Sequence, residues 1–220
     1  TLRFLLANVS DFDIQKDAVP LDRMFDIDRY ALVMTEQVQK RIVDHYLKYE
    51  FHPIVSLLQT FCSEELGAFY LDILKDRLYT TAENSLARRS AQTALWHITD
   101  ALLKLMAPIL SFTADEAWPV FAPERCREPG ASIQEELFHV FPELPDAEAL
   151  DARWSLIRKA RAQVQAHLES QLRERGEIGS SLQAEVALTA PAGELHDALA
   201  SLEDDLRFVL ITSAAQVAAG

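Results

Sequence analysis

The feature that most constrains the fold is a succession of three long segments whose apolar residues recur at helical spacing. The first covers residues 28–50 and the second residues 52–78, where Pro53 fits the first helical turn because its missing N–H costs nothing there. The third follows a capping residue, Asn84 or Ser85, and runs to about Met106. Each segment must bury one face, so the three predict helices that pack in a bundle.

Shorter elements complete this prediction. A first helix begins near Thr1, and a capping box at residues 113–116 precedes a short helix, so residues 1–121 predict a bundle of four or five helices. Residues 122–150, which include Pro129, predict an irregular connection. Beyond it we expect a helix over 151–174, a strand over 184–189, a helix over 193–202 and a second strand over 207–212. The expected fold class is mainly α, with a small α/β subdomain at 151–220.

The composition is that of a globular protein. Hydrophobic residues make up 49% of the 220 residues, yet no apolar run reaches the ~18 residues that span a bilayer, and we expect no signal peptide. Cys62 and Cys126 are expected to be reduced thiols in a cytoplasmic protein. Because the chain opens directly on an amphipathic pattern without Met, we expect it to be part of a longer protein.

The charge restricts how the chain can bind nucleic acid. Its net charge is −13, with 12 Lys and Arg against 17 Asp and Glu in residues 1–121, and 9 against 17 in the remainder. Neither half is basic, so any RNA contact must use a local patch. This suits a module that touches one RNA loop and argues against a protein that coats RNA.

No catalytic or metal constellation stands out. The six His are scattered without an i, i+4 pair or a nearby Cys, and no glycine-rich phosphate loop follows a strand. The acidic pairs are adjacent in sequence and do not share a helix face. We therefore expect no catalysis and no metal site in this chain alone.

A basic and aromatic helix end is the most distinctive local motif. Residues 69–80 read FYLDILKDRLYT, and RNA recognition uses cations for phosphates and flat rings for bases. This sequence resembles the anticodon-binding region of bacterial isoleucyl-tRNA synthetases, which are class I aminoacyl-tRNA ligases. The resemblance continues in residues 1–8, 87–95, 107–118 and 178–182, and covers most of the chain outside 13–27 and 122–150.

The resemblance implies a function and a set of partners. The parent protein would attach isoleucine to its tRNA using ATP and Mg²⁺, and this region would bind the anticodon stem-loop. The nucleotide-binding motifs of the class, His-x-Gly-His and Lys-Met-Ser-Lys-Ser, do not occur here. Family members often carry a four-cysteine zinc module, which two Cys cannot form, so the zinc site is expected outside this chain. The other expected partners are the catalytic and editing domains of the same parent, which we expect to be a monomer.

Lys75, Arg77 and Tyr79 are the first candidate RNA-binding residues. Physical chemistry alone favours a structural role, because cations at a helix C-terminus complement the macrodipole and Tyr79 can pack on the bundle. The resemblance favours RNA binding for at least one of them. Asp72 can also pair with Lys75 at i+3, which would leave that cation less available.

Arg88 and Arg89 lie near the start of the next helix, where the dipole disfavours cations. They need a counter-charge, which is either an RNA phosphate or a carboxylate such as Glu83 or Asp76. Together with Lys75 and Arg77 they form the hypothesised basic edge. Arg3 and Asn8 on the first helix complete the candidate set, although Arg3 can equally tie this helix to an upstream domain.

Three alternatives remain open. The helical region can be a protein-interaction or structural scaffold, which the acidic balance favours. It can also belong to a valyl- or leucyl-type relative, although residues 178–182 and the KDRLYT motif favour the isoleucyl type. Residues 178–182 (IGSSL) can bind a phosphate, but flanking Glu174 and Glu177 favour a simple turn before the strand.

Overall fold

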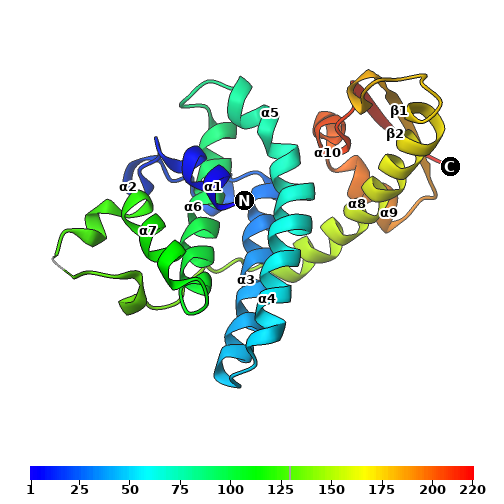
Figure 1. Cartoon of the computed structure of the whole chain (residues 1–220). Helices are drawn as coiled ribbons and strands as arrows, with labels where there is room; N and C mark the ends of the chain where they lie inside the picture. Colours follow the sequence, from blue (N-terminus) through cyan, green and yellow to red (C-terminus); the bar gives the residue numbers. More distant parts are fainter. Residues whose placement is uncertain (129) are drawn as a thin grey trace. The chain divides into compact units, whose positions relative to one another are not determined.

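The computed structural model describes residues 1–128 and 130–220, which form two compact units, 1–145 and 146–220 (Figure 1). Pro129 lies outside the described residues. Most of the described chain is helical, and its strands form one two-stranded sheet. This confirms the predicted fold class, mainly α with a small α/β part. No helix in the described ranges is long and apolar enough to cross a membrane.

The first unit is a helical bundle built around one central helix. That helix is α6 (Leu86–Met106), which contacts α1 (Leu2–Val9), α2 (Ile14–Asp17), α3 (Asp26–Leu47), α5 (Asp72–Thr80) and α7 (Ser111–Phe121). Fourteen of its 21 residues are buried. Helix α4 (Phe51–Thr60) lies beside α3 and continues through a π-helical segment, Phe61–Leu71, into α5 (Figure 1). The predicted bundle is therefore present.

Helix boundaries confirm part of the sequence prediction and correct another part. The hydroxyl of Ser85 accepts a hydrogen bond from the backbone N–H of Arg88 (3.2 Å), so Ser85 and not Asn84 caps α6. The capping box predicted at Thr113 is wrong, because α7 already begins at Ser111. A tight turn precedes it, in which the N–H of Leu110 donates to the carbonyl of Met106 (2.7 Å), so the helix restarts earlier than the motif suggests.

Of the expected irregular connection, 122–150, residues 147–150 already belong to the next helix, whereas residues 122–128 and 130–145 pack against the bundle. They contain two short 3-10 helices, Pro123–Cys126 and Ile133–Glu135. Ile133 is buried in a cluster with residues of α6 and α7, among them Leu103, Ala114 and Trp118. The Nε2 of Gln39 on α3 donates to the carbonyl of His139 (2.6 Å). This segment therefore belongs to the first compact unit.

In the second unit a long helix packs against two shorter helices, which in turn contact a parallel strand pair. It contains α8 (Ala147–His167), a π-helical segment (Leu168–Arg173), a 3-10 helix (Ser181–Gln183), β1 (Glu185–Ala190), α9 (Glu194–Ala200), a second 3-10 helix (Glu203–Asp205), α10 (Leu206–Leu210) and β2 (Ala214–Ala219). The strands β1 and β2 are parallel, with Glu185 opposite Ala214 and Ala190 opposite Ala219. Parallel pairing requires a crossover, which α9 and α10 provide.

The second predicted strand is wrong. Residues 207–212 lie mainly in α10, because Leu206, Val209 and Leu210 are buried at helical spacing. Ile211 then adopts a left-handed backbone conformation (φ 58°), which ends the helix. The strand that pairs with β1 is instead the alanine-rich segment that follows.

Candidate nucleic-acid interface

Lys75 lies on the exposed side of α5. Its Nζ pairs with Asp72 Oδ1 at 2.7 Å, the i, i+3 pairing that the sequence allows. More than half of the Lys75 side chain remains exposed. Exposed ion pairs of this kind stabilise a protein by at most about 1 kcal/mol and are screened by salt, so Lys75 can exchange its partner.

Arg77 points into the bundle, which corrects its expected place on the basic edge. Its guanidinium donates to Oδ1 of the fully buried Asp28, and only 16% of its side chain is exposed. Asp28 also accepts hydrogen bonds from the hydroxyls of Tyr70 (2.8 Å) and Ser90 (2.5 Å). The Arg77 guanidinium lies over the ring of Phe25, 5.1 Å from its centre. Arg77 therefore ties α5 to α3 and α6.

The Asp28 network also changes the ionisation of Tyr70. Burial, and then the adjacent Asp28 carboxylate, raise the pKa of this phenol well above its usual value of 10. Tyr70 therefore remains a hydrogen-bond donor at neutral pH. This keeps the buried carboxylate satisfied by three donors.

Arg88 and Arg89 are paired with carboxylates that the sequence analysis did not name. Arg88 Nη1 lies 2.9 Å from Asp11 Oδ2, and its contact with Glu83 is only a 3.5 Å approach to the backbone carbonyl. Arg89 donates to the carbonyl of Asp11 (3.2 Å) and approaches Asp17 Oδ2 at 3.6 Å. Their side chains are 18% and 11% exposed. The counter-charges therefore come from the segment after α1, correcting the proposed pairing with Glu83 or Asp76.

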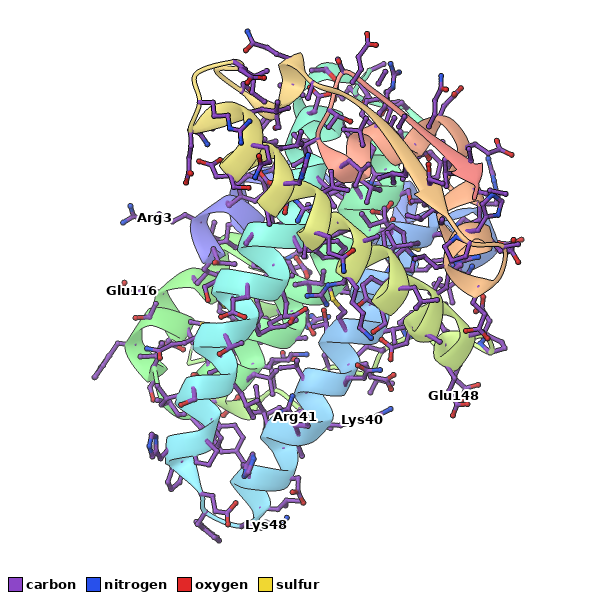
Figure 2. The ribbon with its side chains drawn as sticks, turned by 90° about the vertical axis from the view of Figure 1, so that its right-hand side faces the viewer. Arg3, Lys40, Arg41, Lys48, Glu116 and Glu148 are labelled. Carbon is purple, nitrogen blue, oxygen red and sulfur yellow. The ribbon has the colours of Figure 1, made fainter. Side chains whose placement is uncertain are left out.

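Arg3, Asn8 and Tyr79 have different environments. Arg3 projects from α1 into solvent (Figure 2). Asn8 is buried and donates from Nδ2 to the carbonyl of Phe4 (2.8 Å). Tyr79 is 68% exposed, and its ring meets that of Phe4 edge to face at 6.5 Å. Phe4 thus brings Tyr79 on α5 beside α1, the helix that carries Arg3.

The structure therefore separates the seven candidates into two groups. Three of them, Arg3, Lys75 and Tyr79, are exposed on α1 and α5. Of the other four, Arg77, Arg88 and Arg89 join elements of the bundle through ion pairs, and the buried Asn8 side chain bonds within α1. A continuous edge of four unpaired cations is not formed.

A buried charged cluster that the sequence analysis missed anchors residues 122–145 to α6. Asp100 accepts from Lys104 (2.8 Å), Arg125 (3.1 Å) and His139 Nδ1 (2.6 Å), and the second nitrogen of His139 lies 2.9 Å from His97 Nδ1. Burial raises the pKa of Asp100, but the hydrogen bonds from His139 and Lys104 outweigh it and lower the pKa below its usual range. The i, i+4 spacing of Asp100 and Lys104 was the one sequence signal for this cluster.

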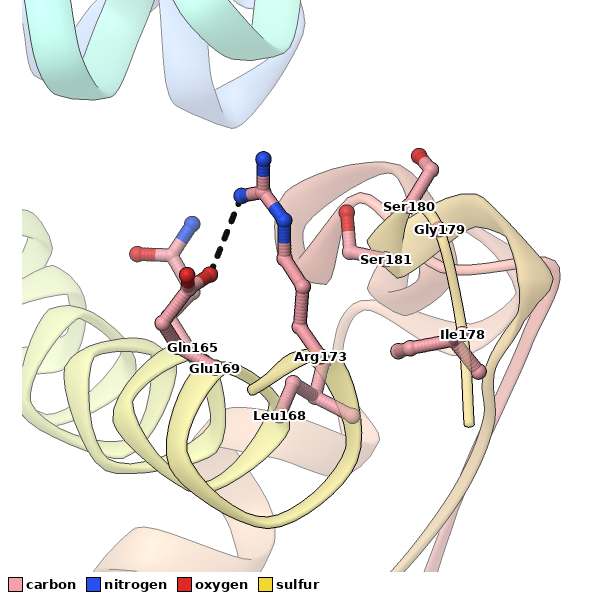
Figure 3. A pocket seen from close by; sticks show the side chains of 8 residues that line it. All are labelled: Gln165, Leu168, Glu169, Arg173, Ile178, Gly179, Ser180 and Ser181. Atoms are coloured by element: carbon pink, nitrogen blue, oxygen red, sulfur yellow. Dashed lines mark hydrogen bonds and ion pairs between the residues drawn. The ribbon is translucent and has the colours of Figure 1, made fainter. Parts of the chain in front are cut away.

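Residues 178–181 line a pocket in the second unit together with residues of α8 and the π-helical segment (Figure 3). Several of its polar groups already have hydrogen-bond partners close by in the sequence. The N–H of Gly179 donates to Gln183 Oε1 (2.6 Å), the hydroxyl of Ser180 accepts from the N–H of Leu182 (3.3 Å), and Arg173 pairs with Glu169 (3.0 Å). These bonds favour the turn interpretation of this segment over a phosphate site.

The geometry defines a helical bundle with exposed cations and an exposed ring on one set of helices, the class of surface that can accept an RNA loop. Comparison with known proteins agrees, because residues 28–188 match the family model described as the anticodon-binding domain of tRNA ligase. The chain belongs to this family.

Curated relatives are similar over almost the whole chain. The isoleucine–tRNA ligase of Bordetella parapertussis is 62% identical over 221 residues, and that of Paraburkholderia phymatum is 58% identical over 217 residues. Each alignment covers 99% of this chain. The chain spans 23% and 22% of the length of these two relatives.

Proposed function

We propose that the chain binds the anticodon stem-loop of isoleucine tRNA as part of an isoleucine–tRNA ligase. The observation that carries this proposal is the 62% identity, over 99% of the chain, to a protein named isoleucine–tRNA ligase. The same identity disfavours a valyl- or leucyl-type parent. The parent would carry catalytic and editing domains in the same chain, use ATP and Mg²⁺ in the catalytic domain, and hold its zinc site outside this region. It would act as a monomer in the cytoplasm.

The candidate residues divide this task. Arg3 and Lys75, which are exposed, would contact phosphates, and the exposed ring of Tyr79 would stack on a base or hydrogen-bond to its edge. One stacked base contributes about 1–3 kcal/mol of binding free energy. A wrong anticodon would leave polar groups unpaired, which is how a distant loop can control aminoacylation.

Asn8, Arg77, Arg88 and Arg89 position these groups. The three arginines join α5 and α6 to α3 and to the segment after α1, so they fix where the exposed residues of α1 and α5 lie. Changing both Arg88 and Arg89 to Ala in the parent is expected to raise the apparent KM for tRNA while amino-acid activation is unchanged. Unchanged tRNA kinetics would remove both residues from the site.

Titration tests the proposal directly. The chain, and in parallel its full-length parent, is titrated with a fluorescent anticodon stem-loop of isoleucine tRNA and with a stem-loop whose anticodon has been exchanged, each at two salt concentrations. We expect preferential binding of the first RNA, with a log–log salt slope near about −0.7 per phosphate contacted. Equal or absent binding by the parent would contradict an anticodon-binding role.

A further inference from the structure

The turn between α3 and α4 carries exposed rings and cations that the proposed function has not yet used. We define the hairpin tip as residues 40–52, the end of α3, the turn, and the start of α4. Figure 1 shows that α3 and α4 run side by side and end at this turn, beyond the other helices of the first unit. The tip is thus free of the unit's own packing on several sides.

Tyr49 is the most unusual residue of the tip. Its side chain is 81% exposed, and its backbone is left-handed (φ 58°) at the position after the α3 C-cap, where glycine or asparagine is usual. A bulky residue in this conformation costs stability, and an exposed ring recovers none of that cost by burial. Folding therefore gives no reason for a tyrosine at this position.

The turn that presents Tyr49 is firmly held. The N–H groups of Tyr49 and Glu50 donate to the carbonyls of Tyr46 (3.1 Å) and His45 (2.9 Å). The hydroxyl of Tyr46 donates to the carbonyl of Leu105 on α6 (2.7 Å), and its ring stacks on Phe138 with centres 6.1 Å apart. The Tyr49 ring is thus displayed from a fixed backbone, so little conformational entropy of the turn is lost when a ligand stacks on it.

A second ring and three cations accompany Tyr49. Phe51, half exposed, meets Tyr46 edge to face at 6.2 Å. Lys40 and Lys48 are exposed and form i, i+4 ion pairs with Glu36 (2.8 Å) and Asp44 (2.6 Å). Such pairs are weak and screened, so both cations can turn to a phosphate.

Arg41 differs from the arginines at the end of α5 and the start of α6. It is exposed and has no ion-pair partner within residues 1–128 and 130–220. Figure 2 shows Lys40, Arg41 and Lys48 along α3 toward the tip. Residues 40–52 hold three cations against the two carboxylates Asp44 and Glu50, in a chain whose net charge is −13.

We propose that the hairpin tip is a second RNA contact, in which unpaired bases stack on Tyr49 and Phe51 while Arg41 and Lys48 bind the flanking phosphates. Exposed rings next to exchangeable cations are the combination that binds single-stranded nucleic acid without reading its sequence. This inference rests on the proposed function, because the RNA is the tRNA bound there, and it assigns part of the affinity to the tip. The tip therefore contributes affinity for unpaired nucleotides and little discrimination between anticodons.

Tyr49→Gly in the full-length parent is the decisive variant. Glycine suits the left-handed backbone, so the variant is expected to fold at least as stably as the wild type while losing the ring. The Kd for isoleucine tRNA should rise at least about fivefold. Tyr49→Phe should retain binding, because stacking needs the ring and not the hydroxyl. Phe112→Ala, which removes another exposed ring of the same unit, is the matched control and should leave the Kd unchanged.

Arg41→Ala tests the phosphate contact. It should reduce the magnitude of the log–log salt slope of tRNA binding by about 0.7, whereas Arg23→Ala, an exposed cation elsewhere in the unit, should not. If wild-type parent prefers isoleucine tRNA but Tyr49→Gly and Arg41→Ala bind it like wild type, the tip proposal is overturned while the proposed function stands. That result would favour a protein partner for the tip. If the wild-type parent shows no preference for isoleucine tRNA, both proposals fall.

Discussion

Replacing Asp28 by Asn should reveal how much the first unit depends on its buried charge network. Asn has nearly the same shape but no charge, so it leaves the Arg77 guanidinium without its buried counter-ion and alters the hydrogen bonds from Tyr70 and Ser90. Breaking a buried ion pair by removing one partner costs about 3–5 kcal/mol. Because 16% of the Arg77 side chain remains exposed and can be hydrated, we expect the lower end, about 3 kcal/mol.

The loss can be measured by thermal and urea unfolding, followed through tryptophan fluorescence in a Trp154→Phe background, so that the signal comes from Trp96 and Trp118 of the first unit. A change of about 3 kcal/mol corresponds to a Tm lower by about 6–12 °C for a chain of this size. Asp26→Asn is the matched control, since Asp26 lies on the same helix with 42% of its side chain exposed. We expect that control to change stability by less than about 0.5 kcal/mol.

A double-mutant cycle with Arg77→Met separates the pair from its surroundings. With Asp28→Asn and Arg77→Met together, no unpaired buried charge remains, so the double variant should be more stable than the sum of the single changes predicts, by about 1–3 kcal/mol. Additive effects, or a loss below about 1 kcal/mol for Asp28→Asn alone, would refute the argument that Arg77 is held by a buried carboxylate.

Two further predictions concern acid stability and the π-helical segment. Burial, then His139, lowers the pKa of His97 from 6.5 to about 4, so the unfolded chain takes up a proton that the folded chain does not. The contribution of His97 to the free energy of unfolding should be constant above about pH 6.5 and fall by about 2–3 kcal/mol toward about pH 4. Urea unfolding at a series of pH values measures this loss, and the His97→Gln variant should show a weaker dependence of stability on pH. Gly67→Ala should destabilise the fold by about 1–3 kcal/mol, because a Cβ there would lie 3.0 Å from the Cys62 carbonyl oxygen. Gly179→Ala is the control, since its Cβ would lie 3.5 Å from the flexible Gln183 side chain. A higher Tm for Gly67→Ala than for the wild type would contradict the predicted crowding.

Local patterns in the sequence were sufficient where the stabilising contacts are also local. The period of apolar residues predicts α3 and α6, and Ser85 caps α6 through a hydrogen bond only three residues away. The pairing of Lys75 with Asp72 is equally local. By contrast, residues 207–212 form a short apolar run, for which helix and strand look alike, and β2 is rich in alanine, a residue with little strand preference.

The environments of the arginines could not be predicted for a related reason. Arg77 pairs with the carboxylate of Asp28 at a separation of 49 residues, and Arg89 donates to the backbone carbonyl of Asp11 at a separation of 78. The helix-dipole argument correctly indicates that Arg88 and Arg89 need counter-charges, but the choice among many carboxylates depends on how α1 packs against α6. The sequence motifs therefore predicted on which helices the arginines lie, but not that their side chains turn inward toward these partners.

The difference between inward and outward cations bears on how an acidic chain can bind RNA at all. Each of the arginines 77, 88 and 89 is offset by a carboxylate within the fold, so it adds little to the field that an approaching phosphate meets. The cations on the surface of α1, α3 and α5 are instead partnered weakly or not at all among the described residues, and they can release a carboxylate when a phosphate arrives. With a Debye length near 10 Å at about 0.1 M salt, such a local patch acts on the nearest phosphates while the more distant negative charge is screened. A net charge of −13 is thus compatible with contact to one RNA loop, and it opposes the close approach of RNA to the rest of the surface.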